Sequence, residues 1–600
     1  MDKAEVFAVA LVGLIALSVP LLSSGLAHFI TGDSYSQALK VEKIARGETV
    51  ADATLFHTVA AFAYSRAAAF SGGEGFNVET LVAVLKVLPG LLGLVAGLSA
   101  YFMLRGIFSK EVSAAGALLS VTSVAFVSRF MSNVVAPETL GLALFLCGAA
   151  FSLQALGRKD WRYAPGAVLM GAAFLAWNGA VLAYAALAIG FAAQVAYMEV
   201  KRTRDNPVLV AAAISIALPL LFLPLASLSG LPGNFGAAEA LGGHFLLIPL
   251  LLLALLLAAV KAWGRLEVGE WDALAFGALA GSLIITGYSP IAALPGFVLA
   301  ACVALRELPG ISNGRVGIIV FGAASAFAAL ILLLGLMSQL PALLFAMFVG
   351  AAGGFLASMY AGKRLAEYAQ LSVAVMLILV SLSSAAIMAH YETDTMSPEM
   401  GAALAWMSEN TTQGAKLAAP GNADVFAFIA QREAENDSAF VAGWLLSNES
   451  TSQLRARGIG YLVLDAGAFD GIEGLKNLSG NADVRIESYL FAKFLKDEQG
   501  TVYAAFYSSN GKTAYIPADE TTGSFLPDAD ALMFDAAGNL MKVPVARFVL
   551  LRDSDGKVVR AIYPFENYDV NLFNAYFGSV EGLSKAYPQG NGEARVFRVG

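Results

Sequence analysis

Two acidic residues stand at matching places in the apolar part of the sequence. Asp33 follows the first long apolar run, and Glu138 begins the fourth one after a very short loop. If both loops lie on one side of a membrane, the two carboxylates could hold a hard divalent cation that binds phosphate groups. A structural role is also open, because Asp33 could cap a helix that begins near Tyr35, and Glu138 could favour the positive end of its own helix dipole.

Two basic residues could assist such a site. Lys86 lies inside the second apolar run and Arg129 lies near the end of the third, and charged groups at such depths are often functional. Either could neutralise a phosphate beside the carboxylates, although Lys86 could equally extend along its own stem to the membrane surface. His57 lies in the loop after Asp33, where a lone histidine is more often solvated or packed than a ligand.

The composition is that of an integral membrane protein, since 58% of the 600 residues are hydrophobic and only 14% are charged. The apolar runs predict a helical membrane domain at 1–390, and ordinary composition predicts a soluble domain at 391–600. The net charge of −8 argues against a nucleic-acid partner. Cys147 and Cys302 both lie in apolar runs, so they are expected to be packing residues.

Runs of about 20 apolar residues predict about thirteen spans. They lie near Ala4–Leu26, Leu81–Met103, Val112–Phe130, Glu138–Leu156, Pro165–Ala180, Val181–Met198, Val208–Leu228, Phe245–Val260, Ala273–Thr286, Ala292–Leu305, Val316–Leu336, Ala342–Tyr360 and Leu371–Ala389. Alternate loops carry the Lys and Arg residues, which predicts a cytoplasmic amino terminus and an external soluble domain. The first apolar run is expected to be a retained span, because no A-x-A-like cleavage site follows it.

The segment 27–80 is predicted to be a long external loop. Within it, Ser36–Ile44 alternates polar and apolar residues at helical spacing, and Asp52–Phe70 is moderately apolar with embedded charges. Both stretches are expected to be helices that lie in the membrane interface.

This order of features resembles the GT-C membrane glycosyltransferases, and more narrowly the archaeal-type catalytic subunit of oligosaccharyltransferase. The family's first loop reads G-D-x-Y-Y-H-x-R, and here Gly32-Asp33-Ser34-Tyr35-Ser36-Gln37 keeps the Gly, the Asp and the first Tyr. The family's second loop reads S-R and then D-x-E-x-x-G, to which Ser128-Arg129, Glu138 and Gly141 correspond. A third stretch, Leu175-Ala176-Trp177-Asn178-Gly179, is similar to the family's W-G-G or W-T-G.

The resemblance implies that Asp33 and Glu138 are catalytic residues that bind Mg²⁺ or Mn²⁺. It also implies a donor site that includes Trp177. Arg129 and Lys86 are the basic residues that could lie beside the phosphate of that donor. Its expected partners are a polyprenyl- or dolichyl-linked glycan and an external acceptor, for which an Asn side chain of a polypeptide is one candidate.

The chain departs from the family pattern at several places. Ala136 stands where the family has the first acid of D-x-E, so one metal ligand is missing. The stretch Lys416–Val425 replaces the family's W-W-D-Y-G, which recognises the acceptor, and no arginine occurs around Ile285–Pro290. Glu239 is a candidate for the glutamate of the family's mobile external loop.

The soluble domain is predicted to be mixed α and β. A helix is expected at Pro398–Ser408, followed by a helix at Ser450–Arg457 and a buried strand at Gly460–Asp465. Later runs read as strands at Thr501–Tyr507, Ala546–Leu551, Val558–Tyr563 and Ala594–Val599. Glycosylation sequons stand at Asn410, Asn436, Asn448 and Asn477, all outside if the predicted topology holds.

These observations favour a membrane glycosyltransferase that takes a glycan from a polyprenyl-phosphate or polyprenyl-diphosphate donor on the external face. Ala136 and the missing acceptor motif keep a second hypothesis open, a non-catalytic relative that binds lipid-linked glycans or partner proteins. A transporter is less favoured, because apart from Lys86 the spans hold few charged residues near the midplane.

Overall fold

The computed structural model divides the chain into two compact units, Met1–Asp394 and Thr395–Gly600. In the first unit it describes residues 2–18, 29, 32–50, 52–71, 76–203, 205–223, 270–285 and 289–307. In the second it describes 398–600 except 466, 471, 480–485, 498–499, 509–510, 520–524, 527, 536, 553–557, 565–569, 578–579 and 589–593. Glu239 and the spans predicted near Phe245, Val316, Ala342 and Leu371 lie outside the described residues.

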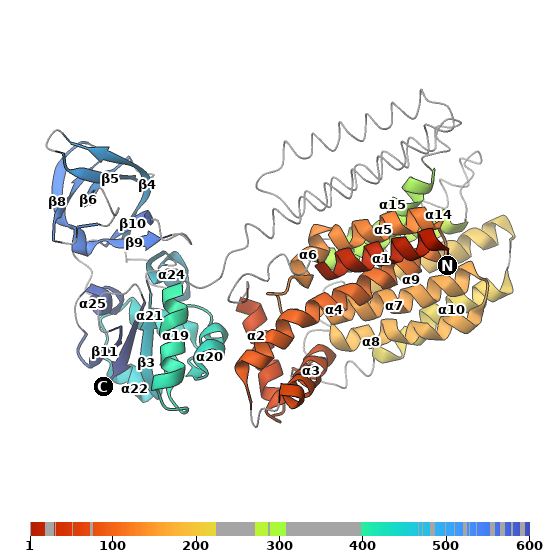
Figure 1. The fold of residues 1–600 in the computed structure, drawn as a ribbon, viewed down its shortest axis with the longest axis horizontal. Helices are drawn as coiled ribbons and strands as arrows, with labels where there is room; N and C mark the ends of the chain where they lie inside the picture. The colour runs from red at the N-terminus through yellow and green to blue at the C-terminus, as the bar shows by residue number, and fades with distance from the viewer. Residues whose placement is uncertain are drawn as a thin grey trace. The chain divides into compact units, whose positions relative to one another are not determined.

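The described part of the first unit is helical (Figure 1). Its helices are α1 (Lys3–Ser18), α2 (Gly32–Ala45), α3 (Leu55–Ser71), α4 (Val78–Arg105), α5 (Lys110–Thr122), α6 (Val124–Phe130), α7 (Glu138–Gly157), η2 (Trp161–Ala167), α8 (Val168–Ala176), α9 (Gly179–Lys201), α10 (Asn206–Leu220), α14 (Glu270–Ile285) and α15 (Pro290–Glu307). Helices α2 and α3 occupy the two stretches of the long loop for which helices were predicted.

Three helices among the described residues, α4, α7 and α9, are long and apolar enough to cross a membrane. Helix α10 and the stretch Ile291–Val303 are apolar but shorter. The three long helices agree with a membrane protein, while the count of about thirteen spans stays a prediction.

Two predicted spans are divided in the structure. The run Val112–Phe130 is broken at Ser123, whose extended backbone has a ψ of 143° and separates α5 from α6. The Ser123 hydroxyl donates to the Ser120 carbonyl and accepts from the Phe126 N–H at 3.3 Å, so it supplies partners that the interrupted helix lacks. The run Pro165–Ala180 is likewise divided among η2, α8, whose C-cap is Trp177, and the first residues of α9.

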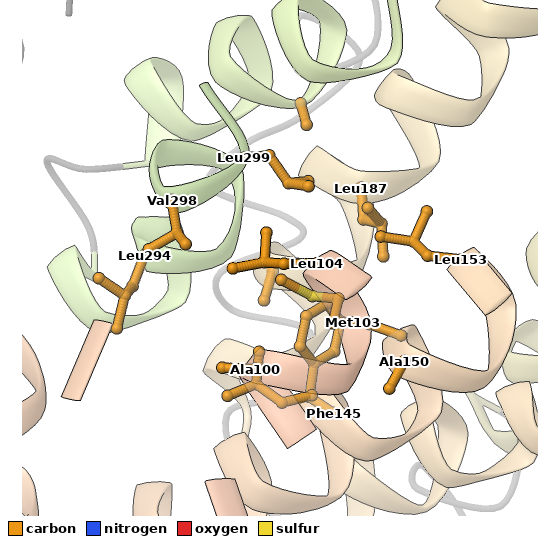
Figure 2. Packing of buried hydrophobic residues seen from close by; sticks show 14 of the residues in the cluster. Ala100, Met103, Leu104, Phe145, Ala150, Leu153, Leu187, Leu294, Val298 and Leu299 are labelled. Atoms are coloured by element: carbon orange, nitrogen blue, oxygen red, sulfur yellow. The ribbon is translucent and has the colours of Figure 1, made fainter. Parts of the chain in front are cut away.

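The core of the first unit lies where α4, α7, α9 and α15 meet. Figure 2 shows Met103 and Leu104 of α4 among leucine, valine and phenylalanine side chains of the other three helices. Gly116 of α5 lets α15 approach closely beside this core, since a Cβ atom on Gly116 would come within 2.3 Å of the Cys302 sulfur. Cys302 is fully buried there, in agreement with a packing role.

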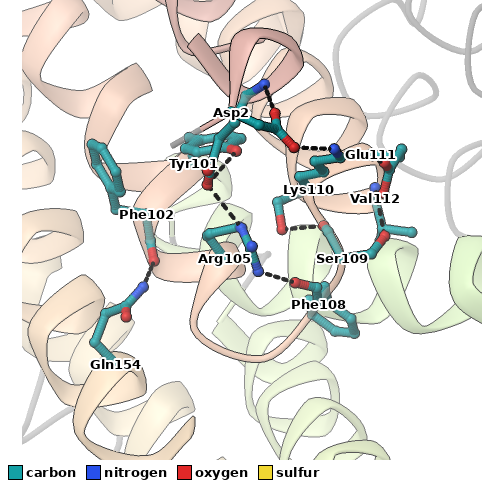
Figure 3. A network of polar contacts seen from close by, with 12 residues as sticks. Asp2, Tyr101, Phe102, Arg105, Phe108, Ser109, Lys110, Glu111, Val112 and Gln154 are labelled. Atoms are coloured by element: carbon teal, nitrogen blue, oxygen red, sulfur yellow. Dashed lines mark hydrogen bonds and ion pairs between the residues drawn. The ribbon is translucent and has the colours of Figure 1, made fainter. Parts of the chain in front are cut away.

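A network of charged groups joins three helices at one end of the unit (Figure 3). Arg105 donates from Nε to Glu5 Oε1 at 3.0 Å, and Lys110 Nζ lies 2.6 Å from Asp2 Oδ2. At the same end, Gln154 of α7 donates to the Phe102 carbonyl of α4 at 2.8 Å. The 20 residues of α7 rise by about 30 Å, so the amino-terminal end of α7 lies far from this network.

The described residues of the second unit form two sheets. The first has the order β11-β12-β3-β1-β2, in which β1, β2 and β3 are parallel and β12 is antiparallel to β3. The second is antiparallel, with the order β8-β7-β6-β5-β4-β10-β9. The strands are β1 (Lys416–Ala418), β2 (Glu433–Ala434), β3 (Ile459–Leu464), β4 (Ile486–Lys496), β5 (Val502–Tyr507), β6 (Thr513–Ala518), β7 (Asp530–Phe534), β8 (Leu540–Pro544), β9 (Val549–Arg552), β10 (Val558–Pro564), β11 (Leu583–Tyr587) and β12 (Arg595–Val599).

Apart from η4, which lies between β8 and β9 of the second sheet, the helices of the second unit precede, follow or connect strands of the first sheet in the sequence. They are α19 (Pro398–Asn410), α20 (Ala423–Ala430), α21 (Ser438–Leu445), α22 (Ser452–Ala456), α23 (Gly467–Asp470), α24 (Ile472–Ser479), η4 (Val545–Arg547) and α25 (Asn571–Phe577). The expected mixed α and β structure is confirmed. The strand predicted at Ala546–Leu551 starts later, because η4 takes up its first residues and β9 begins at Val549.

The two sheets pack around hydrophobic cores, one of which includes Val549 of β9 and Ile562 of β10 from the antiparallel sheet. Trp444, Phe469 and Phe573 belong to the core beside the mixed sheet. Tyr489 and Phe506 belong to a separate core of the antiparallel sheet. The second unit therefore has the apolar burial that a folded domain needs.

Candidate functional site

Asp33 lies in the first turn of α2, with its side chain exposed. The helix begins at Gly32, so the expectation that Asp33 caps a helix starting near Tyr35 is wrong. The carboxylate still lies at the positive end of the helix dipole, which stabilises an acid there. Gln37, one turn further along α2, donates a hydrogen bond from Nε2 to Asp33 Oδ1 at 3.2 Å.

A buried hydrogen bond connects the two predicted loops. The backbone N–H of Val135 donates to the hydroxyl oxygen of Ser34 at 3.1 Å. Ser34 directly follows Asp33 and is fully buried, and Val135 lies in the short loop that precedes Glu138. The structure therefore brings the starts of α2 and α7 together, although the two residues in contact are 101 positions apart in the sequence.

Glu138 is the first residue of α7 and lies beside Arg129. The Nη1 atom of Arg129 is 3.8 Å from Oε1 of Glu138, and the two side chains are 46% and 21% exposed. An ion pair as open to solvent as this one contributes little to stability. Its importance is local, since it places a guanidinium group next to one of the two predicted acids.

Trp177 ends α8 and is 9% exposed. A Cβ atom on Gly141 would lie 2.5 Å from the Trp177 Cβ, and one on Gly179 would lie 2.2 Å from the indole ring. These two glycines therefore let the indole pack against the first turn of α7, just after Glu138. The predicted contact of Trp177 with a donor stays a prediction.

The remaining candidates lie near the same helices. Lys86 lies in the third turn of α4 and is half-buried. Ala136 is 3% exposed in the loop before α7, so the position of the missing acid is filled by a packed methyl group. Among the residues that the structure describes, no group of three or more His, Cys, Asp or Glu side chains could hold a metal ion.

Sequence reasoning missed a set of polar contacts behind Asp33. His57 of α3 is 1% exposed, and both its ring nitrogens have partners: Nδ1 lies 2.8 Å from the Thr54 N–H nitrogen, and Nε2 lies 2.7 Å from Gln37 Oε1. Burial, and next the nearby charge of Lys40, lower the pKa of His57 to about 4. The only available sequence signal was the spacing of Asp33 and Gln37, which puts them on one face of a helix.

A salt bridge forms a second connection between α2 and the start of α3. Lys40 Nζ lies 2.5 Å from Asp52 Oδ2, and the hydrogen bond from Lys40 holds the pKa of the Asp52 carboxyl below its usual range. Two contacts thus connect α2 with the start of α3: the charged pair of Lys40 and Asp52, and the neutral hydrogen bond between His57 and Gln37.

Comparisons with known proteins bear on the fold of this chain. No protein-family model matches it, and no curated protein matches it. The oligosaccharyltransferase of Archaeoglobus fulgidus in its apo form is similar in structure, with a TM-score of 0.50 and 14% sequence identity over 86% of this chain and 77% of that chain. The same enzyme in complex with Zn and sulfate has a TM-score of 0.49 and 15% identity, over 85% of this chain and 75% of that chain.

ArnT from Cupriavidus metallidurans, bound to undecaprenyl phosphate, has a TM-score of 0.43 and 16% identity over 81% of this chain and 96% of that chain. At these levels of identity the comparison concerns the fold. The resemblance drawn from the sequence motifs is confirmed at that level: this chain has the fold of the archaeal oligosaccharyltransferase.

Proposed function

We propose that this chain is a membrane glycosyltransferase that transfers a glycan from a polyprenyl-phosphate or polyprenyl-diphosphate donor to an acceptor on the external face. The observation that carries the proposal is the Ser34 to Val135 hydrogen bond, which brings the loop of Asp33 to the loop of Glu138. The two acids then stand at adjoining helix starts, with Arg129 of α6 beside Glu138, in a fold that an oligosaccharyltransferase also has. A protein Asn side chain is the finer proposal for the acceptor.

The acidic and the basic residues have different roles in the proposed reaction. The carboxylates of Asp33 and Glu138 can accept hydrogens of an acceptor N–H or O–H group and so direct its lone pair toward the anomeric carbon. Arg129 is nearly half exposed, so its guanidinium can donate to phosphate oxygens as negative charge develops on the leaving group. Lys86 and Trp177 complete the proposal as further donor-site residues, and Glu239 as an acid of the external loop.

A divalent cation is part of the proposal, and the donor set fits it in part. Asp33 and Glu138 supply two carboxylates. An acidic residue at the position of Ala136 would have supplied a third. Two carboxylates suffice for Mg²⁺ or Mn²⁺ when water and substrate phosphate oxygens complete the shell. Bound there, the ion would neutralise phosphate charge.

The test is transfer of a radiolabelled glycan from dolichyl phosphate or dolichyl diphosphate to a sequon peptide, with and without Mn²⁺. We expect Asp33→Asn and Glu138→Gln each to lower kcat by about a hundredfold, the usual scale for losing one preorganised charged group. Glu79→Gln is the matched control, because this exposed acid lies in the first turn of α4, outside the proposed site. Transfer at the wild-type rate by both acid variants would contradict the proposal.

A second candidate is a non-catalytic relative that binds lipid-linked glycans, which the buried Ala136 favours. It predicts binding of the labelled lipid by the wild-type protein without transfer to any acceptor tested. The same assay, with retention of the lipid on the purified protein as a second readout, separates the two candidates.

A further inference from the structure

A chain of three hydrogen bonds extends from the interior of the long loop to Asp33. Thr54 contacts His57, His57 contacts Gln37, and Gln37 contacts Asp33, at 2.8, 2.7 and 3.2 Å. The chain crosses from α3 to α2 and becomes more exposed along its length, since His57 is buried, Gln37 is half-buried and Asp33 is exposed. Its last group is an acid of the proposed site.

The direction of every hydrogen bond follows from its first member. The backbone N–H of Thr54 can only donate, so Nδ1 of His57 must accept and the ring carries its hydrogen on Nε2. That hydrogen can only go to Oε1 of Gln37, which leaves the Gln37 amide nitrogen facing the Asp33 carboxylate. Rotating the amide by half a turn would break both of its contacts, so the buried histidine determines which group Asp33 meets.

A purely local role would not need this arrangement. Side chains one turn apart on a helix often pair, but such a pair needs no buried partner on its far side. Nor is the chain the only connection between α2 and the start of α3, since Lys40 and Asp52 already join these segments at 2.5 Å. The salt bridge already attaches these two segments to each other. The neutral chain of hydrogen bonds in addition orients the carboxylate of Asp33.

We infer that Gln37, held by His57, is a positioning residue that fixes the carboxylate of Asp33 in its orientation for glycosyl transfer. The inference rests on the proposed function. Gln37 reaches the reaction through Asp33 and touches no reacting atom. Its neutral amide leaves the full negative charge on Asp33, whereas a lysine or arginine there would neutralise it.

The test uses the full chain in lipid nanodiscs and two readouts. The first is kcat and KM for glycan transfer from the labelled dolichyl donor. The second is labelling of carboxyl groups by a carbodiimide and glycine ethyl ester, read for Asp33 by mass spectrometry, which needs no activity. Gln37→Met keeps the length of the side chain without its hydrogen bonds, and His57→Phe keeps a ring without its donor.

We expect Gln37→Met to lower kcat by about tenfold with KM unchanged, because misplacing a catalytic group acts on the chemical step. Labelling of Asp33 should rise severalfold, while labelling of Glu79 stays constant. His57→Phe should change both readouts in the same direction, and His57→Gln, which restores a donor toward Gln37, should recover part of the loss. In an Asp33→Asn background, Gln37→Met should cost nothing further.

Asp52→Asn is the matched control, because it weakens the other contact between α2 and the start of α3 without touching the chain. It should leave kcat and Asp33 labelling at wild-type values. Wild-type kcat and labelling in Gln37→Met, or an equal loss in Asp52→Asn, would overturn the inference. If the wild-type protein transfers no glycan, the proposed function fails by itself, and unchanged Asp33 labelling in Gln37→Met would still overturn the positioning of Asp33.

Discussion

The two acids of the proposed site have partners of different charge. Asp33 receives a hydrogen bond from a neutral amide, whereas Glu138 lies 3.8 Å from the guanidinium of Arg129. Arg129 therefore offsets part of the negative charge of Glu138, and Asp33 keeps its own. A cation or an acceptor N–H group would meet more uncompensated charge at Asp33. This difference makes Asp33 the first residue to substitute.

The buried His57 leads to a prediction about stability and pH. Its pKa is lowered in the folded protein from 6.5 to about 4, mainly by burial and next by Lys40, while Asp52 and Asp33 oppose the shift. Between these values the unfolded chain binds more protons than the folded chain. Folded stability should therefore fall as the pH drops from about 6.5 to about 4, by about 3 kcal/mol from this residue.

Thermal unfolding of the wild-type protein and of His57→Gln between pH 8 and pH 4 checks this prediction. Other groups of the protein titrate in the same range, so the difference between the two curves is the quantity to measure. We expect the Tm of the variant to fall less steeply than that of the wild type. Parallel curves of Tm against pH for the two proteins would contradict the prediction, because they would show that protonation of His57 does not destabilise the folded protein.

At the scale of the helix, Gly141 connects a sequence motif with packing. It lies one turn after Glu138, and Trp177 packs so closely against it that a larger residue at position 141 would overlap with the tryptophan. Because the nearest atom is the Trp177 Cβ, at 2.5 Å, a different rotamer of the indole cannot relieve the overlap. The position of Glu138 thus depends on how closely the end of α8 approaches α7.

We expect Gly141→Ala to destabilise the protein by about 1–3 kcal/mol, the usual cost of overpacking, and to lower transfer by moving the start of α7. Gly443→Ala is the control, since Gly443 also lies in a helix, α21, but has open space around its added Cβ. Alanine there should be neutral or stabilising by about 0.5–1 kcal/mol. Equal Tm values for Gly141→Ala and the wild type would contradict this expectation. They would mean that the loop before α9 moves to accommodate the added methyl group with no loss of stability.

The sequence predicts those elements that are determined by residues close together along the chain. The start of α7 at Glu138 and the helices α2 and α3 follow from short-range periodicity and spacing. The contact of His57 with Gln37 joins residues 20 positions apart and depends on how two helices pack, which periodicity does not encode. The break at Ser123 was missed because an unbroken apolar run reads as one span, although a serine hydroxyl can satisfy an interrupted helix.

At the scale of the whole chain, composition alone predicted an apolar part at 1–390 and a soluble part at 391–600. The structure divides the chain into Met1–Asp394 and Thr395–Gly600. The order of strands in the antiparallel sheet could not be read from the sequence, since its neighbours β4 and β10 are distant along the chain. Which side of the membrane each unit faces rests on the distribution of Lys and Arg residues.

The topology can be tested with single cysteines in a variant that lacks Cys147 and Cys302. Arg162 lies in η2, which follows α7 at the end of the unit that holds the Arg105 network, and Gln413 is exposed in the second unit. We expect an impermeant maleimide to label Gln413→Cys on intact cells and Arg162→Cys only after the cells are opened. Because α7 is about as long as the membrane core is thick, external labelling of Arg162→Cys would move the acids to the cytoplasmic face. The donor would then have to present its glycan on the cytoplasmic side, so this experiment also decides on which face the proposed transfer occurs.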